Sequence, residues 1–241
     1  MSLSYRVIAR LDVKGSSLIK GVRFEGLRKL GLPVEFAKRY ADQGADELLF
    51  LHVASLYGKH NLLPLLEETS QEVFVPITAG GGVRSLGDVE ALLRAGADKV
   101  AINTAALERQ ELIRECADRF GCQAIVVSIE AKRRPGGWEA YHNYGRDPSG
   151  KDVFDWMLQA EELGAGEILL TSIDRDGTRS GPEPGLSWGC GIPVVYSGGC
   201  TVATALRAAD GADAIAVGTA LHYGETIGAF KKALGEGYTV R

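Results

Sequence analysis

Short apolar runs alternate with longer amphipathic stretches along almost the whole chain of 241 residues. The runs are nearly continuous in Val, Ile, Leu and Ala, which is typical of parallel strands covered on both faces. We expect such strands at 5–12, 47–53, 73–78, 98–103, 124–130, 167–173, 192–197 and 213–218. Helical spacing of apolar residues predicts helices over 34–43, 86–95, 107–119 and 152–163. Eight such units predict a single α/β domain, residues 1–241, folded as a (β/α)8 barrel.

The two halves of the sequence repeat each other. Segment 44–51 (GADELLFL) parallels segment 164–171 (GAGEILLT), and segment 96–102 (GADKVAI) parallels segment 211–217 (GADAIAV). These repeats indicate a TIM barrel built from two similar half-barrels of four units each. A doubled half-barrel also predicts a doubled binding site.

One unit breaks the pattern. Segment 181–191 (GPEPGLSWGCG) lies between the sixth and seventh expected strands and is dense in proline and glycine. Proline and glycine are the residues that an ordinary helix tolerates least. We therefore expect the sixth outer helix to be shortened or absent.

Composition narrows the class of protein. A formal charge of −4 argues against nucleic acid as a partner, because phosphate backbones need clustered positive surface. The cysteines and histidines lack the spacings of metal sites, so we expect no metal and no cofactor. We also expect no signal peptide and no membrane-spanning segment, hence a soluble cytoplasmic protein with reduced thiols.

Three acidic residues lie at or just past the ends of expected strands. Asp12 closes the first strand, Glu130 closes the fifth, and Asp176 follows the sixth. The loops after the strands carry the site in barrels of this kind, and two carboxyls in one cavity can divide acid and base duties. The alternative is that these residues cap helices or pair with Lys14 and Lys132.

Glycine-rich turns follow strands three and seven, and short polar turns follow strands four and eight. Glycine lets backbone N–H groups approach an anion closely, so paired turns predict two phosphate sites on opposite sides of the mouth. Tight turns without a ligand are the alternative. The candidate residues are Gly82, Asn103, Thr104, Gly177, Ser197, Gly198, Gly199, Gly218 and Thr219.

Four charged residues start strands at the opposite end of the barrel, namely Arg6, Glu47, Lys99 and Glu167. A charged layer inside a barrel is costly unless its members pair. Such a layer fits either an ion-paired plug or a gate to a polar passage, and the residues alone leave both open. His52, which ends the second strand, is a further candidate for the mouth.

Over nearly its whole length the chain resembles the cyclase subunits of imidazole glycerol phosphate synthase, from histidine biosynthesis. The resemblance lies in segments 10–15, 20–24, 44–48, 80–82, 102–105 and 169–178. It implies that ammonia is added to a bis-phosphorylated aminoimidazole carboxamide ribonucleotide. The products would be imidazole glycerol phosphate and an aminoimidazole carboxamide ribotide, and the partner a glutaminase (glutamine amidotransferase) subunit in a heterodimer.

The resemblance also implies residue roles. Asp12 matches a general acid/base, Asp176 a second catalytic carboxylate, and Glu130 the place of a third aspartate. Lys20 matches a residue of a mobile first loop that closes over substrate. The turn residues above match two phosphate cradles, and the four charged residues match a gate through which the partner's ammonia passes.

Three departures from the family pattern leave other functions open. His52 replaces an aspartate, Glu130 is longer by one methylene, and the sixth helix is degraded. One alternative is a paralogue that delivers ammonia to sugar or surface-glycan modification. Another is a catalytically silent barrel that binds phosphate or a glutaminase. The isomerase of the same pathway shares the half-barrel repeat but fits segment 174–178 less well.

Overall fold

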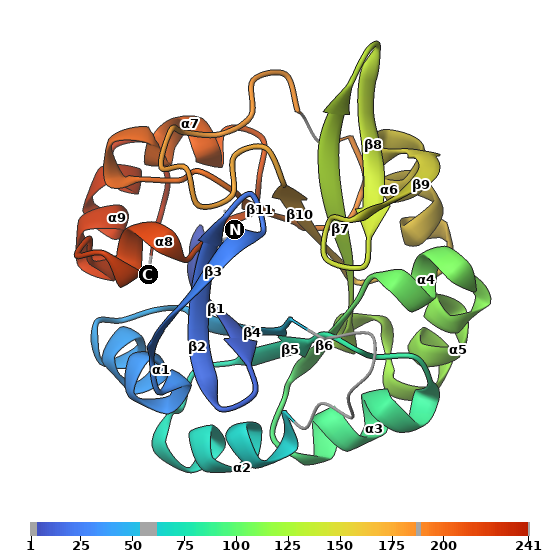
Figure 1. The fold of residues 1–241 in the computed structure, drawn as a ribbon, viewed down its shortest axis with the longest axis horizontal. Coiled ribbons are helices and arrows are strands. Elements are labelled where there is room, and N and C mark those ends of the chain that lie inside the picture. Colours follow the sequence, from blue (N-terminus) through green and yellow to red (C-terminus); the bar gives the residue numbers. More distant parts are fainter. Residues whose placement is uncertain (1–3, 54–61, 187–188, 241) are drawn as a thin grey trace.

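The computed structural model describes residues 4–53, 62–186 and 189–240. Among them, eight parallel strands pair in the order β10, β11, β12, β1, β4, β5, β6 and β7, and pairing of β10 with β7 closes the barrel (Figure 1). This confirms the expected fold. The barrel strands are β1 (Arg6–Lys14), β4 (Glu47–His52), β5 (Ile77–Gly80), β6 (Lys99–Ile102), β7 (Ile125–Arg134), β10 (Glu167–Ser172), β11 (Val194–Ser197) and β12 (Ala214–Val217).

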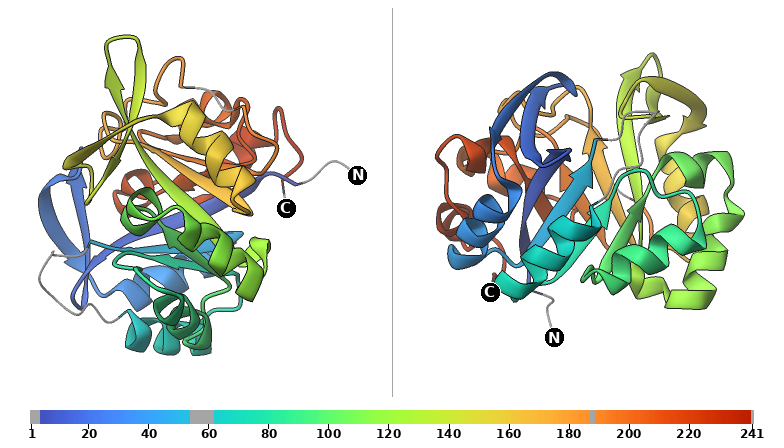
Figure 2. Two further views of the ribbon diagram at one scale, coloured as in Figure 1. Left: turned by 90° about the vertical axis from the view of Figure 1, so that its right-hand side faces the viewer. Right: turned by 60° about the horizontal axis from the view of Figure 1, so that its bottom comes forward.

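Helices surround the barrel on its outside (Figure 2). None of those in the described ranges has the length and apolar character needed to cross a membrane. They are α1 (Pro33–Asp42), α2 (Leu63–Glu72), α3 (Leu86–Arg94), α4 (Thr104–Glu108), α5 (Glu111–Phe120), α6 (Val153–Glu162), α7 (Ala205–Ala209), α8 (Thr219–His222) and α9 (Ile227–Leu234).

Two of the expected elements are wrong in detail. The third strand begins at Ile77 rather than at 73, because Pro76 has no N–H for the ladder and Phe74 is 91% exposed. The single helix expected over 107–119 is divided into α4 and α5, since Arg109 between them is extended, with φ −140° and ψ 90°. In both places the pattern of apolar residues predicted the wrong bounds, because it carries no information about a local change in the backbone at Pro76 or Arg109.

The repeated Gly-Ala-Asp motif has a structural cause. Each of its aspartates accepts the backbone N–H that begins the preceding neighbour strand: Asp46 from Val7, Asp98 from Ile77 and Asp213 from Val194, at 2.8–2.9 Å. The carboxylates thereby satisfy donors that the start of a strand leaves unpaired. The motif fixes where neighbouring strands begin, and its recurrence reflects the repeat of the unit.

Two antiparallel hairpins extend from the barrel, and the sequence did not predict them. Strands β2 (Ser17–Val22) and β3 (Glu25–Gly31) follow β1, while β8 (Gly137–His142) and β9 (Asp147–Asp152) follow β7. They occupy the same place in each half-barrel. Each turn carries a pair of non-glycine residues with positive φ, Arg23 and Phe24 in the first and Asn143 and Tyr144 in the second. The first is a two-residue loop with the geometry of a type I′ turn, whereas the second is longer and is closed by the Arg146 N–H, which donates to the His142 carbonyl at 3.1 Å.

The sixth outer helix is absent from the described residues between β10 and β11, as expected. In place of the helix, residues 173–186 and 189–193 form an irregular segment, here called the strap, which the buried Glu183 holds. Its carboxylate accepts from Arg175 at 2.8 Å and from Arg133 at 3.2 Å, and its backbone N–H donates to the Tyr196 hydroxyl at 2.9 Å. Residues 187–188 of the strap lie outside the described ranges.

Candidate active site

The carboxyl ends of the barrel strands form a mouth that holds the three predicted acidic residues. Asp12 and Glu130 point inward from β1 and β7, which stand opposite each other in the eight-stranded ring. Asp176 lies in the turn after β10 and is buried. Asp12 and Glu130 thus occupy equivalent places in the two half-barrels.

Lys20 on β2 joins two of these carboxylates. Its Nζ donates to Asp12 Oδ2 at 2.6 Å and to both oxygens of Asp176 at 3.0 Å. All three side chains are buried. The resemblance placed Lys20 on a first loop, and the structure instead places it in a β-strand of the first hairpin. One ammonium group thus spans two carboxylates at the mouth.

Arg10, which the sequence did not suggest as a site residue, is a second buried cation at the mouth. Its Nε donates to Asp12 Oδ1 at 2.9 Å, so both oxygens of Asp12 are bound by cations. Burial alone would raise the pKa of Asp12, but Arg10 and Lys20 together hold it far below its usual range. Arg10 precedes Asp12 by two positions on one strand, so strand parity could have revealed that both point inward.

Glu130 has a different environment. Its carboxylate accepts the backbone N–H of Gly145 at 2.7 Å, and no salt bridge to it occurs within the described ranges. Burial in the mouth raises the pKa of Glu130 to about 7, and the Gly145 N–H, Arg10 and Asn103 offset this only in part. The site therefore holds one carboxylate fixed in its charged form and another that changes protonation near neutral pH.

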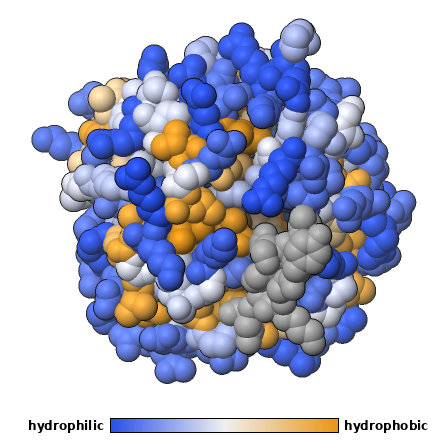
Figure 3. Space-filling model, in the orientation of Figure 1, coloured by the Kyte–Doolittle hydropathy of each residue, from blue (hydrophilic) through white to orange (hydrophobic). Residues whose placement is uncertain are grey.

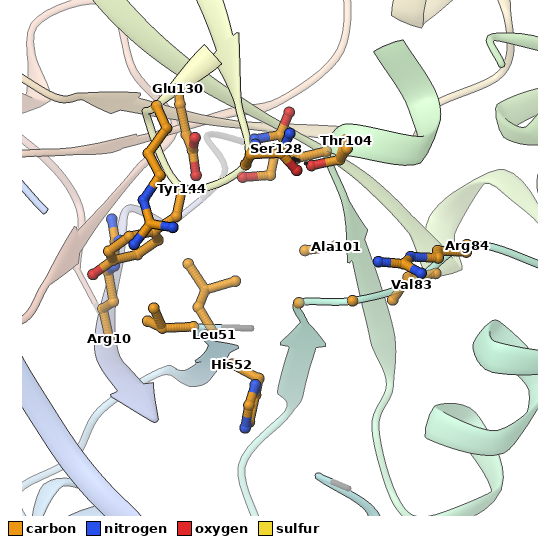
Figure 4. Close-up of a pocket in the computed structure, with 16 residues that line it drawn as sticks. Arg10, Leu51, His52, Val83, Arg84, Ala101, Thr104, Ser128, Glu130 and Tyr144 are labelled. Atoms are coloured by element: carbon orange, nitrogen blue, oxygen red, sulfur yellow. Dashed lines mark hydrogen bonds between the residues drawn. The ribbon is translucent and has the colours of Figure 1, made fainter. Parts of the chain in front are cut away.

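One side of the mouth contains a cavity of about 120 Å³ beside β5, β6 and β7. Gly82, Asn103 and Thr104 line it together, as predicted, and so does His52. Arg84 and Arg146, which the sequence did not suggest, also line the cavity and add positive charge to it. Figure 4 shows Arg84 on one side of this cavity and Arg10 with Tyr144 on the other. These groups can bind an anionic ligand.

A second, smaller hollow of about 20 Å³ lies across the mouth beside β11 and β12. At Gly199, where φ is +72°, an added Cβ would lie 2.3 Å from the Gly181 carbonyl oxygen. Within the described ranges, the buried Thr219 Oγ1 has no hydrogen-bond partner and is available to an oxyanion. All six residues predicted here line the hollow, namely Gly177, Ser197, Gly198, Gly199, Gly218 and Thr219.

The two hairpins meet over the mouth. Phe24 at the tip of the first and Tyr144 at the tip of the second pack with Tyr141 and Ile173 in a small apolar cluster. Figure 3, which views this face, shows apolar residues gathered near its middle with polar residues around them. The hairpins thus contribute a cover that limits access of water to the carboxylates.

The four charged residues at the other end of the barrel form a closed ion-paired ring. Arg6 donates to Glu47 at 3.1 Å and to Glu167 at 2.5 Å, and Lys99 donates to the same carboxylates at 2.8 and 2.7 Å. Thr78 also donates to Glu47. An apolar layer that includes Ile8, Leu49, Ala101 and Leu169, each two residues farther along its strand, separates this ring from the mouth.

Comparison with known proteins decides the family. The model of a family described as histidine biosynthesis protein matches residues 6–226. The chain belongs to this family.

Two curated members of the histidine biosynthesis family show how close the similarity is. The imidazole glycerol phosphate synthase subunit HisF of Legionella pneumophila is 56% identical over 200 residues, which cover 80% of this chain and 94% of the relative. The subunit of the same name from Myxococcus xanthus (strain DK1622) is 47% identical over 243 residues, covering 97% of this chain and 96% of the relative. The similarity thus extends over the barrel, the strap and both hairpins.

Proposed function

We propose that this chain is the cyclase subunit of imidazole glycerol phosphate synthase. It uses ammonia to convert a bis-phosphorylated aminoimidazole carboxamide ribonucleotide into imidazole glycerol phosphate and an aminoimidazole carboxamide ribotide. The observation that carries this proposal is Lys20 bound to Asp12 and Asp176 between two anion-binding hollows on opposite sides of the mouth. A ligand with phosphate at both ends matches that arrangement.

The geometry supports separate roles for the hollows, which bind phosphate, and for the carboxylates, which act on the reacting centre. The two hollows bind the terminal phosphates and thereby fix the reacting centre between them, above Asp12 and beside Glu130. Asp12 and Asp176 supply carboxylates next to the Lys20 ammonium, and Glu130 exchanges protons near neutral pH. No step of this scheme requires a cofactor, since ring closure and cleavage proceed by proton transfer and nucleophilic addition.

We assign the ring of Arg6, Glu47, Lys99 and Glu167 to the gate of an ammonia passage. Neutral ammonia crosses an apolar layer more easily than ammonium does, because an unpaired charge in an apolar interior is costly. The source of ammonia is a glutaminase subunit that docks beneath this ring and forms a heterodimer with the barrel. We place the pair in the cytoplasm, where free thiols such as those of this chain persist.

The proposal is tested by steady-state turnover of the bis-phosphorylated ribonucleotide with an ammonium salt, without the partner, followed by ultraviolet absorbance. We expect turnover that Asp12→Asn abolishes while the affinity for substrate stays within about threefold, because the phosphates are bound elsewhere. Substrate binding without turnover at any pH would replace the proposal with a silent barrel. Neither binding nor turnover would favour an ammonia-delivering paralogue with another acceptor.

A further inference from the structure

Arg10 is anchored at three points inside the barrel. Only 2% of its surface is exposed. Besides the bond from Nε to Asp12, its Nη1 donates to Thr171 Oγ1 on β10 at 3.2 Å and to Ser197 Oγ on β11 at 3.1 Å. These bonds tie the guanidinium, which β1 carries, to β10 and β11, two adjacent strands that β12 separates from β1. A buried guanidinium that donates to one carboxylate and two hydroxyls stabilises the charged form of that carboxylate. The same bonds limit its freedom to reorient.

The two cations bound to Asp12 belong to different parts of the fold: Lys20 to the first hairpin and Arg10 to a barrel strand. Lys20 comes from the β2–β3 hairpin, whose tip contributes to the cover over the mouth, and it divides its ammonium between Asp12 and Asp176. Arg10 lies on the same strand as Asp12, two residues away, and makes no salt bridge to Asp176. A displacement of the hairpin would carry Lys20 away from Asp12, whereas Arg10 belongs to β1 and is bonded to Asp12, Thr171 and Ser197 within the barrel.

Other ionisable groups also act on Asp12. Lys20 faces it from β2, Glu130 from β7, Tyr144 from the turn between β8 and β9, and His222 from α8. Asp176 reaches it through their shared Lys20. Glu130 differs from Asp12 and Asp176, whose carboxylates bind cations. It lies opposite Asp12, binds no cation in the described structure and accepts a hydrogen bond from a backbone N–H.

We propose that Arg10 is a positioning residue that keeps Asp12 ionised and aimed into the mouth, including when Lys20 has moved away. Asp12 then accepts a proton or stabilises positive charge during the reaction and never donates a proton of its own at the start of a cycle. Proton donation falls to Glu130. This inference rests on the proposed cyclase function, and it gives Arg10, which also lines the larger cavity, a role at the Asp12 carboxylate.

The test compares wild type with Arg10→Gln, Arg10→Lys and Thr171→Val. Two quantities are measured: kcat for ammonium-dependent turnover between about pH 5 and 9, and the carboxyl ¹³C titration of Asp12, assigned by its loss in Asp12→Asn. In Arg10→Gln we expect burial to raise the titration of Asp12 far enough to reach the acid end of this range, so that kcat falls most there. Arg10→Lys restores most of both.

Thr171→Val keeps the guanidinium but removes one of its anchors. We expect a smaller shift in the same direction, which keeps the inference testable if Arg10→Gln does not fold. An equal loss of kcat at every pH, with the titration of Asp12 unchanged, would overturn the inference. Arg10 would then contribute only to the packing of the barrel interior. If wild type has no turnover but the titration of Asp12 moves in Arg10→Gln, the cyclase proposal fails and the effect of Arg10 on Asp12 stands.

Discussion

The ring of Phe24 stacks on the ring of Tyr144, with centroids 4.4 Å apart and planes inclined by 20°. Each residue has positive φ in the turn of its hairpin, and the two hairpins come from equivalent places in the two half-barrels. The contact therefore joins one half of the molecule to the other directly over the carboxylates.

We predict that Phe24→Leu and Tyr144→Leu are energetically coupled. An aromatic pair contributes about 1 kcal/mol beyond the burial of its area, so the two losses in free energy of unfolding should not add. A double-mutant cycle by urea denaturation measures the coupling. Additive losses would mean that the rings share the cluster without a specific interaction. Either substitution should also raise KM, because the cover then closes less completely.

A second prediction concerns turnover and pH. Burial raises the pKa of Glu130 to about 7, so the group loses its proton as the pH rises through neutrality. If Glu130 is the proton donor, kcat falls as the pH rises above about 7, and Glu130→Gln removes this limb together with most activity. The test is to measure kcat at saturating substrate between about pH 5.5 and 9, a range that brackets a general acid with a pKa of about 7. A flat profile for wild type would exclude the role.

The same residue predicts a pH dependence of stability. A carboxyl of ordinary pKa 4.5 ionises in the unfolded chain while folded Glu130 keeps its proton up to about pH 7. The unfolded state therefore binds fewer protons in this window, and the free energy of unfolding falls as the pH rises from 4.5 to 7. Glu130→Gln should lose this part of the fall. Parallel denaturant curves for both proteins across the window measure it, and identical slopes would contradict the prediction.

The strap predicts a large effect of Glu183→Gln. The substitution leaves Arg175 and Arg133 without their shared carboxylate, of which 3% is exposed. We expect the free energy of unfolding to fall by about 2 kcal/mol, because charged hydrogen bonds to a buried group are lost. Glu72→Gln, which breaks the exposed pair with Lys38, is the matched control and should have little effect. Equal effects of the two would show that the strap is not held by Glu183.

Gly199→Ala tests the smaller hollow. The new Cβ would meet the Gly181 carbonyl oxygen at 2.3 Å, in a backbone conformation that L residues rarely adopt. We expect KM for the bis-phosphorylated substrate to rise about tenfold as the backbone donors shift from the phosphate. Gly228→Ala in α9 meets no atom within 4 Å and should leave KM unchanged. An unchanged KM for Gly199→Ala would show that this hollow does not bind a phosphate of the substrate.

Much of the fold follows from the sequence because a parallel barrel repeats one pattern. Apolar runs locate the strands, and the Gly-Ala-Asp motif marks where they begin. The hairpins escaped prediction because β3 and β9 are largely exposed and carry charge and glycine instead of an apolar alternation. Their signal is local, in the turn residues, and those residues adopt positive φ without being glycine.

The site was predictable wherever function depends on position along a strand. Asp12, Glu130 and the four members of the ion-paired ring all have a defined place relative to strand ends. Arg10 was missed because a cation within an apolar strand looks like an interruption until its three partners, from β1, β10 and β11, are seen. Thr171 and Ser197 are distant from Arg10 in sequence, and only the closed barrel brings them to it.

The described segment before β1 lies beside the segment that follows α9. Tyr5 pairs in parallel with Val240, its N–H donates to the Thr239 carbonyl at 2.7 Å, and its ring lies 4.9 Å from that of Tyr238. A short peptide linker can therefore connect the ends without disturbing a strand. Because each half-barrel brings its own hairpin, carboxylate and anion-binding turn, a circular permutant opened near Gly121 would present the second half before the first and assemble the same mouth.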